Sequence, residues 1–191
     1  MFNKIKIIKD PHKIDVLVNK LNKLPDNYIP KDLLPINSNN TINMQYLRKE
    51  AKYHFEKMCE KAKVKGYTIL AVSSFRTSDY QEKLYNNYCL EKGIEYANMC
   101  SAKKNHSEHQ TGLAVDVSDI KGEYNNFENT KEFVWMKNNS YKYGFILRYP
   151  KYKTDITGYK FEPWHYRYVG TYLAKKLYKN NLTLEEYKNQ S

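Results

Sequence analysis

The chain has 191 residues, an ordinary size for one domain, and its 32 Lys and Arg residues against 21 Asp and Glu residues give a formal net charge of +11 at pH 7. It contains no run of about 18 apolar residues, which excludes a membrane-spanning helix, and an aromatic content of 15% excludes a disordered chain. The positive charge would attract any polyanion, but no nucleic-acid partner is expected, because the chain has no arginine-rich arm, zinc-finger pattern or RNA-binding pair of aromatics.

The first part of the chain differs from the rest in composition. Residues 1–42 are rich in Pro, Asn and Asp, and we predict an extended lead-in that packs on a main domain of residues 43–191. Within the lead-in, Ile14–Val18 is predicted to be a short strand. The basic segment Met1–Lys9 has neither the apolar core nor the cleavage site of a signal peptide. If Met1 is the native start, we expect a cytoplasmic protein; if a signal or anchor was removed, we expect the cell envelope.

Beyond the lead-in, helical and extended patterns follow one another along the chain. Apolar residues at three- and four-residue spacing predict a helix from Met44 to Lys65, which Gly66 ends. The further predicted elements are a strand over 67–72, a helix over 77–92, a strand over 112–117, a helix over 130–142, strands over 145–149 and 165–169, and helices over 171–180 and 183–189. Because this order has no βαβ rhythm, we predict a single α+β domain with a small, mainly antiparallel sheet flanked by helices.

Two histidines stand out because acidic residues lie near them. His109 precedes an apolar segment that contains Asp116, where a lone carboxylate is costly unless it is paired or binds a metal. His165 follows Glu162 by three residues at the start of a predicted strand. Two imidazoles and one carboxylate can bind zinc and leave a fourth position open for water, and a further carboxylate such as Glu162 can act as general base. A hydrogen-bonded structural His–Asp pair remains the alternative at this stage.

The order of these motifs resembles that of a peptidase family. Ser107–Asp116 (SEHQTGLAVD) followed by Glu162–His165 (EPWH) is similar to the SxHxxGxAxD…ExxH signature of the zinc D-Ala-D-Ala carboxypeptidases and dipeptidases of the VanY, VanX and VanXY type. The segment around Arg76, Tyr143–Pro150 and Leu182–Tyr187 also resemble this family. The resemblance therefore extends over most of the chain.

The resemblance implies a catalytic zinc centre in a cleft on the sheet. Its three Zn²⁺ ligands would be His109, Asp116 and His165. Glu162 would be the general base, taking a proton from water and passing it to the leaving amine. Arg76 would approach the scissile carbonyl, where its guanidinium stabilises the developing oxyanion.

The resemblance also suggests residues that contact the substrate. Ser107 and Gln81 are expected to hydrogen-bond its terminal region, and Trp164 is expected to face it. An exposed helix position for Gln81 and a core position for Trp164 are the alternatives. Glu108 adjoins His109 but is not expected to bind the metal.

The implied activity is that of a zinc-dependent D-alanyl-D-alanine carboxypeptidase. Residues 43–191 would be its catalytic domain, a monomer that removes the terminal D-Ala of peptidoglycan stem pentapeptides, in the precursor or in the wall. An L,D-carboxypeptidase acting on stem tetrapeptides and a bifunctional D,D-dipeptidase and carboxypeptidase are alternatives with the same motifs. A catalytically silent zinc- or wall-binding module is the non-enzymatic alternative. The presence of Glu162 and Arg76 favours an enzyme, because a binding module has no need of a base beside an open metal position.

Overall fold

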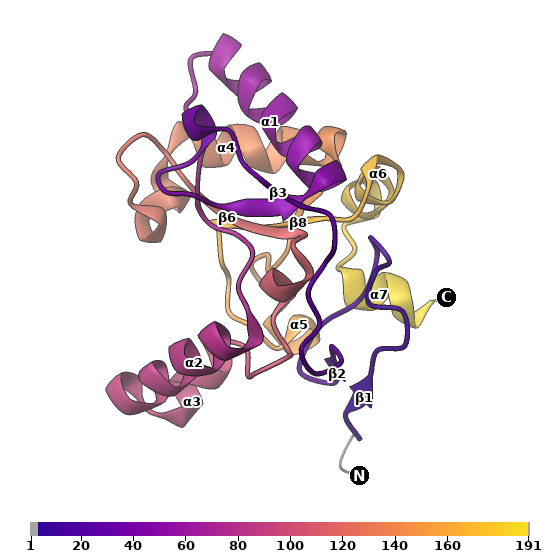
Figure 1. The fold of residues 1–191 in the computed structure, drawn as a ribbon. Helices are drawn as coiled ribbons and strands as arrows, with labels where there is room; N and C mark the ends of the chain where they lie inside the picture. The colour runs from indigo at the N-terminus through magenta and orange to yellow at the C-terminus, as the bar shows by residue number, and fades with distance from the viewer. Residues whose placement is uncertain (1–3, 191) are drawn as a thin grey trace.

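The computed structural model of this protein describes residues 4–190. A four-stranded sheet lies at the centre of the fold (Figure 1). In spatial order its strands are β5 (Leu70–Ser73), β6 (Ala114–Ser118), β8 (His165–Tyr168) and β7 (Phe145–Leu147). All neighbouring pairs in this sheet are antiparallel. The predicted α+β class with a small antiparallel sheet is therefore confirmed, although the strands begin or end a few residues away from the predicted bounds.

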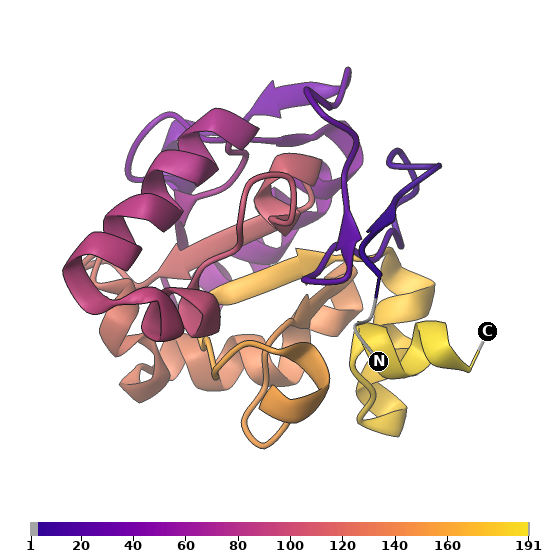
Figure 2. The ribbon, with the colours of Figure 1, turned by 90° about the horizontal axis from the view of Figure 1, so that it is seen from below.

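Helices surround this sheet. They are α1 (Lys49–Val64), α2 (Ser78–Lys92), α3 (Ile94–Cys100), α4 (Lys131–Asn139), α5 (Thr154–Thr157), α6 (Thr171–Asn180) and α7 (Leu184–Asn189), with 3₁₀ turns η1 (Ser38–Asn40), η2 (Glu108–Thr111), η3 (Tyr124–Asn129) and η4 (Ser140–Tyr143). Helices α1 and α4 lie over one face of the sheet, and the α2–α3 pair projects from the other side (Figure 1). In the view from below, α6, α7 and the N-terminal segment lie together on one side and α2 on the other (Figure 2).

The two faces of the central strands have opposite chemical character, because successive residues of a strand point to opposite sides. Val115, Val117, Tyr166 and Tyr168 belong to the main hydrophobic core with Phe55 and Met58 of α1. Asp116, His165 and Arg167 occupy the intervening positions and are also buried. Burying ionisable groups is costly unless they are paired or bind a metal, so this face of the sheet is where a functional site is expected.

Two small sheets involve the N-terminal segment, residues 4–42. β1 (Lys6–Ile7) pairs in parallel with β2 (Asn22–Lys23), and β3 (Leu33–Pro35) pairs antiparallel with β4 (Tyr46–Arg48). The predicted strand Ile14–Val18 is wrong, since these residues are in no strand. Instead, Nη2 of Arg167 donates hydrogen bonds to the carbonyl oxygens of Ile14 and Val16. A buried guanidinium thus satisfies the backbone groups that a neighbouring strand would have bonded.

The first long helix begins later than its periodicity suggested. The prediction placed its start at Met44, but residues 46–48 form β4, and α1 begins at Lys49. Leu47 fits the helical spacing, yet it pairs with Leu34 across the β3–β4 ladder and is fully buried there. Helix α2 has the predicted bounds, with the Thr77 side chain capping its first turn, whereas α3 was not predicted. Among residues 4–190, no helix has both the length and the apolar character needed to cross a bilayer.

Candidate active site

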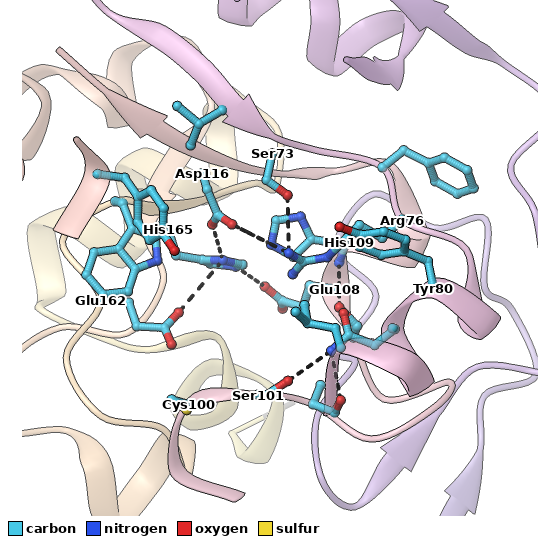
Figure 3. A pocket seen from close by; sticks show the side chains of 18 of the residues that line it. Ser73, Arg76, Tyr80, Cys100, Ser101, Glu108, His109, Asp116, Glu162 and His165 are labelled. Carbon is cyan, nitrogen blue, oxygen red and sulfur yellow. Dashed lines mark hydrogen bonds and ion pairs between the residues drawn. The ribbon is translucent and has the colours of Figure 1, made fainter. Parts of the chain in front are cut away.

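The antiparallel register brings Asp116 and His165 together. They are direct partners in the β6–β8 ladder, so their side chains leave the sheet side by side on the face opposite the core. Asp116 Oδ1 lies 2.9 Å from His165 Nδ1. His109 joins them, and the candidate ligand atoms of all three residues lie within 4.8 Å of one another (Figure 3). Residues 49 positions apart in the sequence thus share one small volume.

His109 reaches this point on the 3₁₀ turn η2. The Ser107 side chain begins the turn by accepting a hydrogen bond from the His109 N–H at 3.3 Å. Gly112 ends it in the left-handed region, with φ of 65°. A Cβ at Gly112 would stand 2.7 Å from the Leu33 side chain, so only glycine fits there without movement of its neighbours. This tight turn places His109 at the site and lets the chain enter β6 at Ala114, two residues after Gly112.

The hydrogen bonds of His109 show what its ring can bind. Nδ1 donates to the Ser74 carbonyl at 2.6 Å, so Nε2 of the neutral ring carries a lone pair. Burial and the nearby Arg76 charge lower the pKa of His109 to about 4, which keeps the ring neutral at pH 7. Nε2 is buried without a hydrogen-bond partner within residues 4–190 and lies 3.3 Å from Asp116 Oδ2. Two lone pairs that face each other at this distance repel unless a cation lies between them, so these donors fit a metal ion.

The other two members of the cluster have strongly shifted pKa values. Burial would raise the pKa of Asp116, but the hydrogen bond and charge of the His165 ring outweigh it and hold the pKa well below its ordinary value. Burial would lower the pKa of His165, but its hydrogen bonds with Asp116 and Glu108 outweigh it and raise the pKa to about 9. In the metal-free protein, therefore, the Asp116 carboxylate is ionised and already offers the negative charge that a divalent cation needs.

Glu162 lies beside the three-residue cluster. Its Oε2 is 3.9 Å from His165 Nδ1, and the side chain is buried (Figure 3). A backbone hydrogen bond from its N–H to the Tyr149 carbonyl fixes the loop before β8. Burial, opposed by the His165 charge, raises the pKa of Glu162 to about 7. A carboxyl with this pKa exchanges protons near neutral pH, as a general base must.

Arg76 brings a guanidinium group to the site. It follows β5 just after a register shift between Ala71 and Ser73, and its Nη1 donates to Ser73 Oγ at 3.2 Å. The same nitrogen is 3.9 Å from Asp116 Oδ2, while Nε is buried without a hydrogen-bond partner within residues 4–190. The guanidinium therefore keeps donor capacity for a ligand beside the cluster.

All of these side chains line one cavity of about 720 Å³. The remaining predicted residues, Ser107, Gln81 and Trp164, line it too. Gln81 is fully buried rather than exposed; its amide nitrogen donates to Ser101 Oγ and the Ala102 carbonyl, and its Oε1 has no partner within the described chain. Trp164 is half-buried and packs edge-to-face against Tyr124. The wall also includes eight further aromatic side chains, those of Tyr46, Phe75, Tyr80, Tyr88, Tyr96, Tyr124, Tyr149 and Tyr159.

Sequence reasoning missed the part that Glu108 plays. Its side chain is buried and reaches the far side of His165, where Oε2 lies 3.4 Å from Nε2. Oε1 accepts hydrogen bonds from Arg148 Nε at 2.8 Å and Arg167 Nη1 at 2.7 Å. The signal in the sequence was an arginine within each of the two predicted apolar strands, over 145–149 and 165–169, because a buried arginine requires a buried acid.

Comparison with known proteins identifies the family. Residues 44–171, more than half of the chain, match the VanY family of D-alanyl-D-alanine carboxypeptidases. The chain belongs to the VanY family. It is 44% identical to YodJ of Bacillus subtilis (strain 168) over 96% of this chain and 70% of that protein.

Solved structures of relatives have the same fold. The LD-carboxypeptidase LdcB is 44% identical, with a TM-score of 0.90 over 97% of this chain and 90% of the other. A vancomycin-resistance D,D-pentapeptidase of the VanY type, solved in complex with Zn(II), is 32% identical, with a TM-score of 0.78 over 91% of this chain and 98% of the other. The VanY family is thus one of zinc metallopeptidases, and this chain carries a His–Asp–His cluster that could bind a metal.

Proposed function

We propose that this protein is a zinc-dependent carboxypeptidase that removes the terminal D-alanine from peptidoglycan stem peptides, with residues 43–191 as its catalytic domain. The observation that carries the proposal is the unpartnered His109 Nε2, which faces the Asp116 carboxylate with Glu162 close by. A structural His–Asp pair would have used that nitrogen as a donor. A binding module would have no reason to bury a carboxylic acid beside the cluster at the cost of a raised pKa.

The proposed metal ligands are His109 Nε2, an Asp116 oxygen and His165 Nδ1. Two imidazoles and one carboxylate match the three-ligand set of catalytic zinc sites, which leave one position open. Bound Zn²⁺ would supply Lewis acidity, lowering the pKa of a water molecule and polarising the scissile carbonyl.

The side chains around the cluster would then move the proton and stabilise charge. Glu162 accepts the proton that water loses as its oxygen bonds to the carbonyl carbon, and delivers it to the D-alanine nitrogen as the C–N bond breaks. In the metal-free protein, burial already raises the pKa of this carboxyl to about 7, so its ordinary strong preference for the ionised form is lost before any ligand binds. Arg76 donates to the carbonyl oxygen as negative charge develops there, with hydrogen-bond capacity that it does not use within the described chain.

Polar groups on the cavity wall would hold the end of the peptide. Ser107 Oγ accepts the His109 N–H, so its hydroxyl hydrogen is available for the terminal carboxylate. Gln81 Oε1, buried and without a partner in residues 4–190, would accept a peptide N–H. Trp164 and the tyrosines of the wall would pack against the apolar parts of the stem.

Within this function we propose L,D-carboxypeptidase activity on the stem tetrapeptide. The LD-carboxypeptidase LdcB, at 44% identity and a TM-score of 0.90, supports this assignment over the D,D activity that the motifs alone had placed first. D,D-carboxypeptidase activity on the pentapeptide is the second candidate, supported by the name of the matching family and by the D,D-pentapeptidase at 32% identity. Both reactions release D-alanine and differ in the residue on the other side of the broken bond.

A competition experiment distinguishes these activities. The zinc-loaded protein is given equal amounts of stem tetrapeptide, stem pentapeptide and free D-Ala-D-Ala, and the products are identified by mass spectrometry, with Glu162→Ala in parallel. Loss of D-alanine mainly from the tetrapeptide, absent in the variant, is the expected result. Preferred cleavage of the pentapeptide or the dipeptide would replace the L,D assignment and keep the mechanism. No turnover of any substrate would overturn the carboxypeptidase proposal in favour of a binding module.

A further inference from the structure

We propose that Glu108 is a positioning residue that holds the His165 ring with Nε2 protonated and Nδ1 facing the metal site. The inference rests on the proposed function, because it concerns a ligand of the proposed zinc ion. It adds a residue that the motif comparison assigned no role and connects the site to both ends of the chain.

The contacts of His165 define the two sides of its ring. Nδ1 faces Asp116 Oδ1 at 2.9 Å, and Nε2 faces Glu108 Oε2 at 3.4 Å (Figure 3). When a metal ion displaces one of the two ring protons, the imidazole keeps the other, and the nitrogen that keeps it cannot bind the metal. A carboxylate acceptor at Nε2 keeps the proton there, which leaves the Nδ1 lone pair for the ion. Without Glu108, the proton could rest on Nδ1 with Asp116 as acceptor, and that tautomer blocks the ligand position.

The position of Glu108 is itself fixed by two buried arginines. Its Oε1 accepts from Arg148 and Arg167, both fully buried, so Oε2 is held toward the imidazole. If Glu108 served only to neutralise the arginines, its second oxygen would need no imidazole beside it. Tyr149 packs against the His165 ring, with ring centroids 5.0 Å apart, and restricts the ring from another side. Outer hydrogen-bond partners of this kind orient metal-binding histidines in many proteins.

The same arginines connect the site to the two ends of the chain. Arg148 forms a two-pronged ion pair with Glu185 of α7, at 2.8 and 2.6 Å. Arg167 donates to the Ile14 and Val16 carbonyls of the N-terminal segment. The N-terminal segment and the last helix therefore contact the two arginines that bond Glu108, a residue 57 positions from His165 in the sequence.

The test compares Glu108→Gln with Glu185→Gln in the whole 191-residue chain. Both changes remove a buried carboxylate bonded to Arg148, but only Glu108 contacts His165. We expect the zinc dissociation constant, measured by competition with a chelating dye, to rise about 10- to 100-fold in Glu108→Gln and less than about threefold in Glu185→Gln. Equal changes in both variants, or none in Glu108→Gln, would overturn the proposal.

A measurement on the unaltered protein keeps the proposal testable if a variant does not fold. In zinc-loaded protein with ¹⁵N-labelled histidine, the NMR spectrum should show His165 with its proton on Nε2 and the metal on Nδ1. The opposite assignment would overturn the proposal. If the unaltered protein binds no zinc at all, the proposed function fails; if it binds zinc and cleaves stem peptides while Glu108→Gln retains full affinity, only the role of Glu108 fails.

Discussion

Replacing Glu162 with glutamine should separate the catalytic role of this carboxyl from its effect on stability. Burial raises its pKa to about 7 in the metal-free fold, against an ordinary value of 4.5. Because the folded state holds the proton more tightly than the unfolded chain, the free energy of unfolding should fall as the pH rises from 4.5 to 7 and stay low above 7. At about 1.36 kcal/mol per pKa unit, the full penalty is about 3 kcal/mol.

Glu162→Gln keeps the shape of the side chain and removes its charge. The metal-free variant should therefore be more stable than the parent by up to about 3 kcal/mol at pH 8 and equal to it at pH 4. The same change removes the proton acceptor, so kcat of the zinc-loaded enzyme should fall by about 10²- to 10⁴-fold. Thermal unfolding after treatment with EDTA measures the first effect, and the rate of D-alanine release measures the second.

The control is Glu91→Gln, an exposed carboxylate on α2, which should change neither quantity. Equal stability of parent and Glu162→Gln at pH 8 would refute the argument that burial of this carboxyl is costly. An unchanged kcat would refute its role in proton transfer.

Three further substitutions or conditions test other parts of the site. Arg76→Lys loses the planar guanidinium and should lower kcat about 10²- to 10³-fold, while the zinc dissociation constant stays nearly unchanged. If steady-state kinetics show that the variant keeps full kcat, Arg76 does not stabilise the oxyanion. Burial lowers the pKa of His165, but hydrogen bonds with two carboxylates outweigh it and raise the pKa to about 9, so zinc must displace a proton there. The apparent zinc affinity should fall about tenfold per pH unit between pH 8 and 6, and a pH-independent affinity in chelator competition would contradict this. Gly112→Ala puts a Cβ 2.7 Å from the Leu33 side chain at a φ of 65°, so the free energy of unfolding in urea should fall by about 1–3 kcal/mol. An unchanged free energy of unfolding would show that the turn adjusts to the added Cβ without strain.

The fold could be predicted where local signals and tertiary structure agree. Helix α2 was predicted over residues 77–92, and the structure has it at Ser78–Lys92, with the Thr77 side chain capping its first turn. The prediction failed for Ile14–Val18, because the groups that satisfy its backbone belong to Arg167, a residue far along the chain. It also failed at the start of α1, where Leu47 suits a helix and a strand equally and pairing with Leu34 decides.

For the candidate site too, local motifs could be predicted from the sequence, whereas contacts between distant segments could not. Motif spacing singled out His109, Asp116, Glu162 and His165, and the structure brings all four together in one cavity. The spacing could not show which nitrogen of each ring faces the centre, since that depends on the Ser74 carbonyl in one case and on Glu108 in the other. Hydrogen bonds that set a tautomer come from distant segments and leave no local pattern.

The sequence by itself determined the residue types of the site and the class of the fold, because ligand chemistry and strand periodicity are properties of short segments. Only the tertiary structure decided the geometry. The register of β6 against β8 sets Asp116 beside His165, and burial on all sides shifts the pKa of Glu162 to about 7. Both effects depend on groups that the chain brings together only when it folds, so their strength cannot be obtained from the order of residues alone.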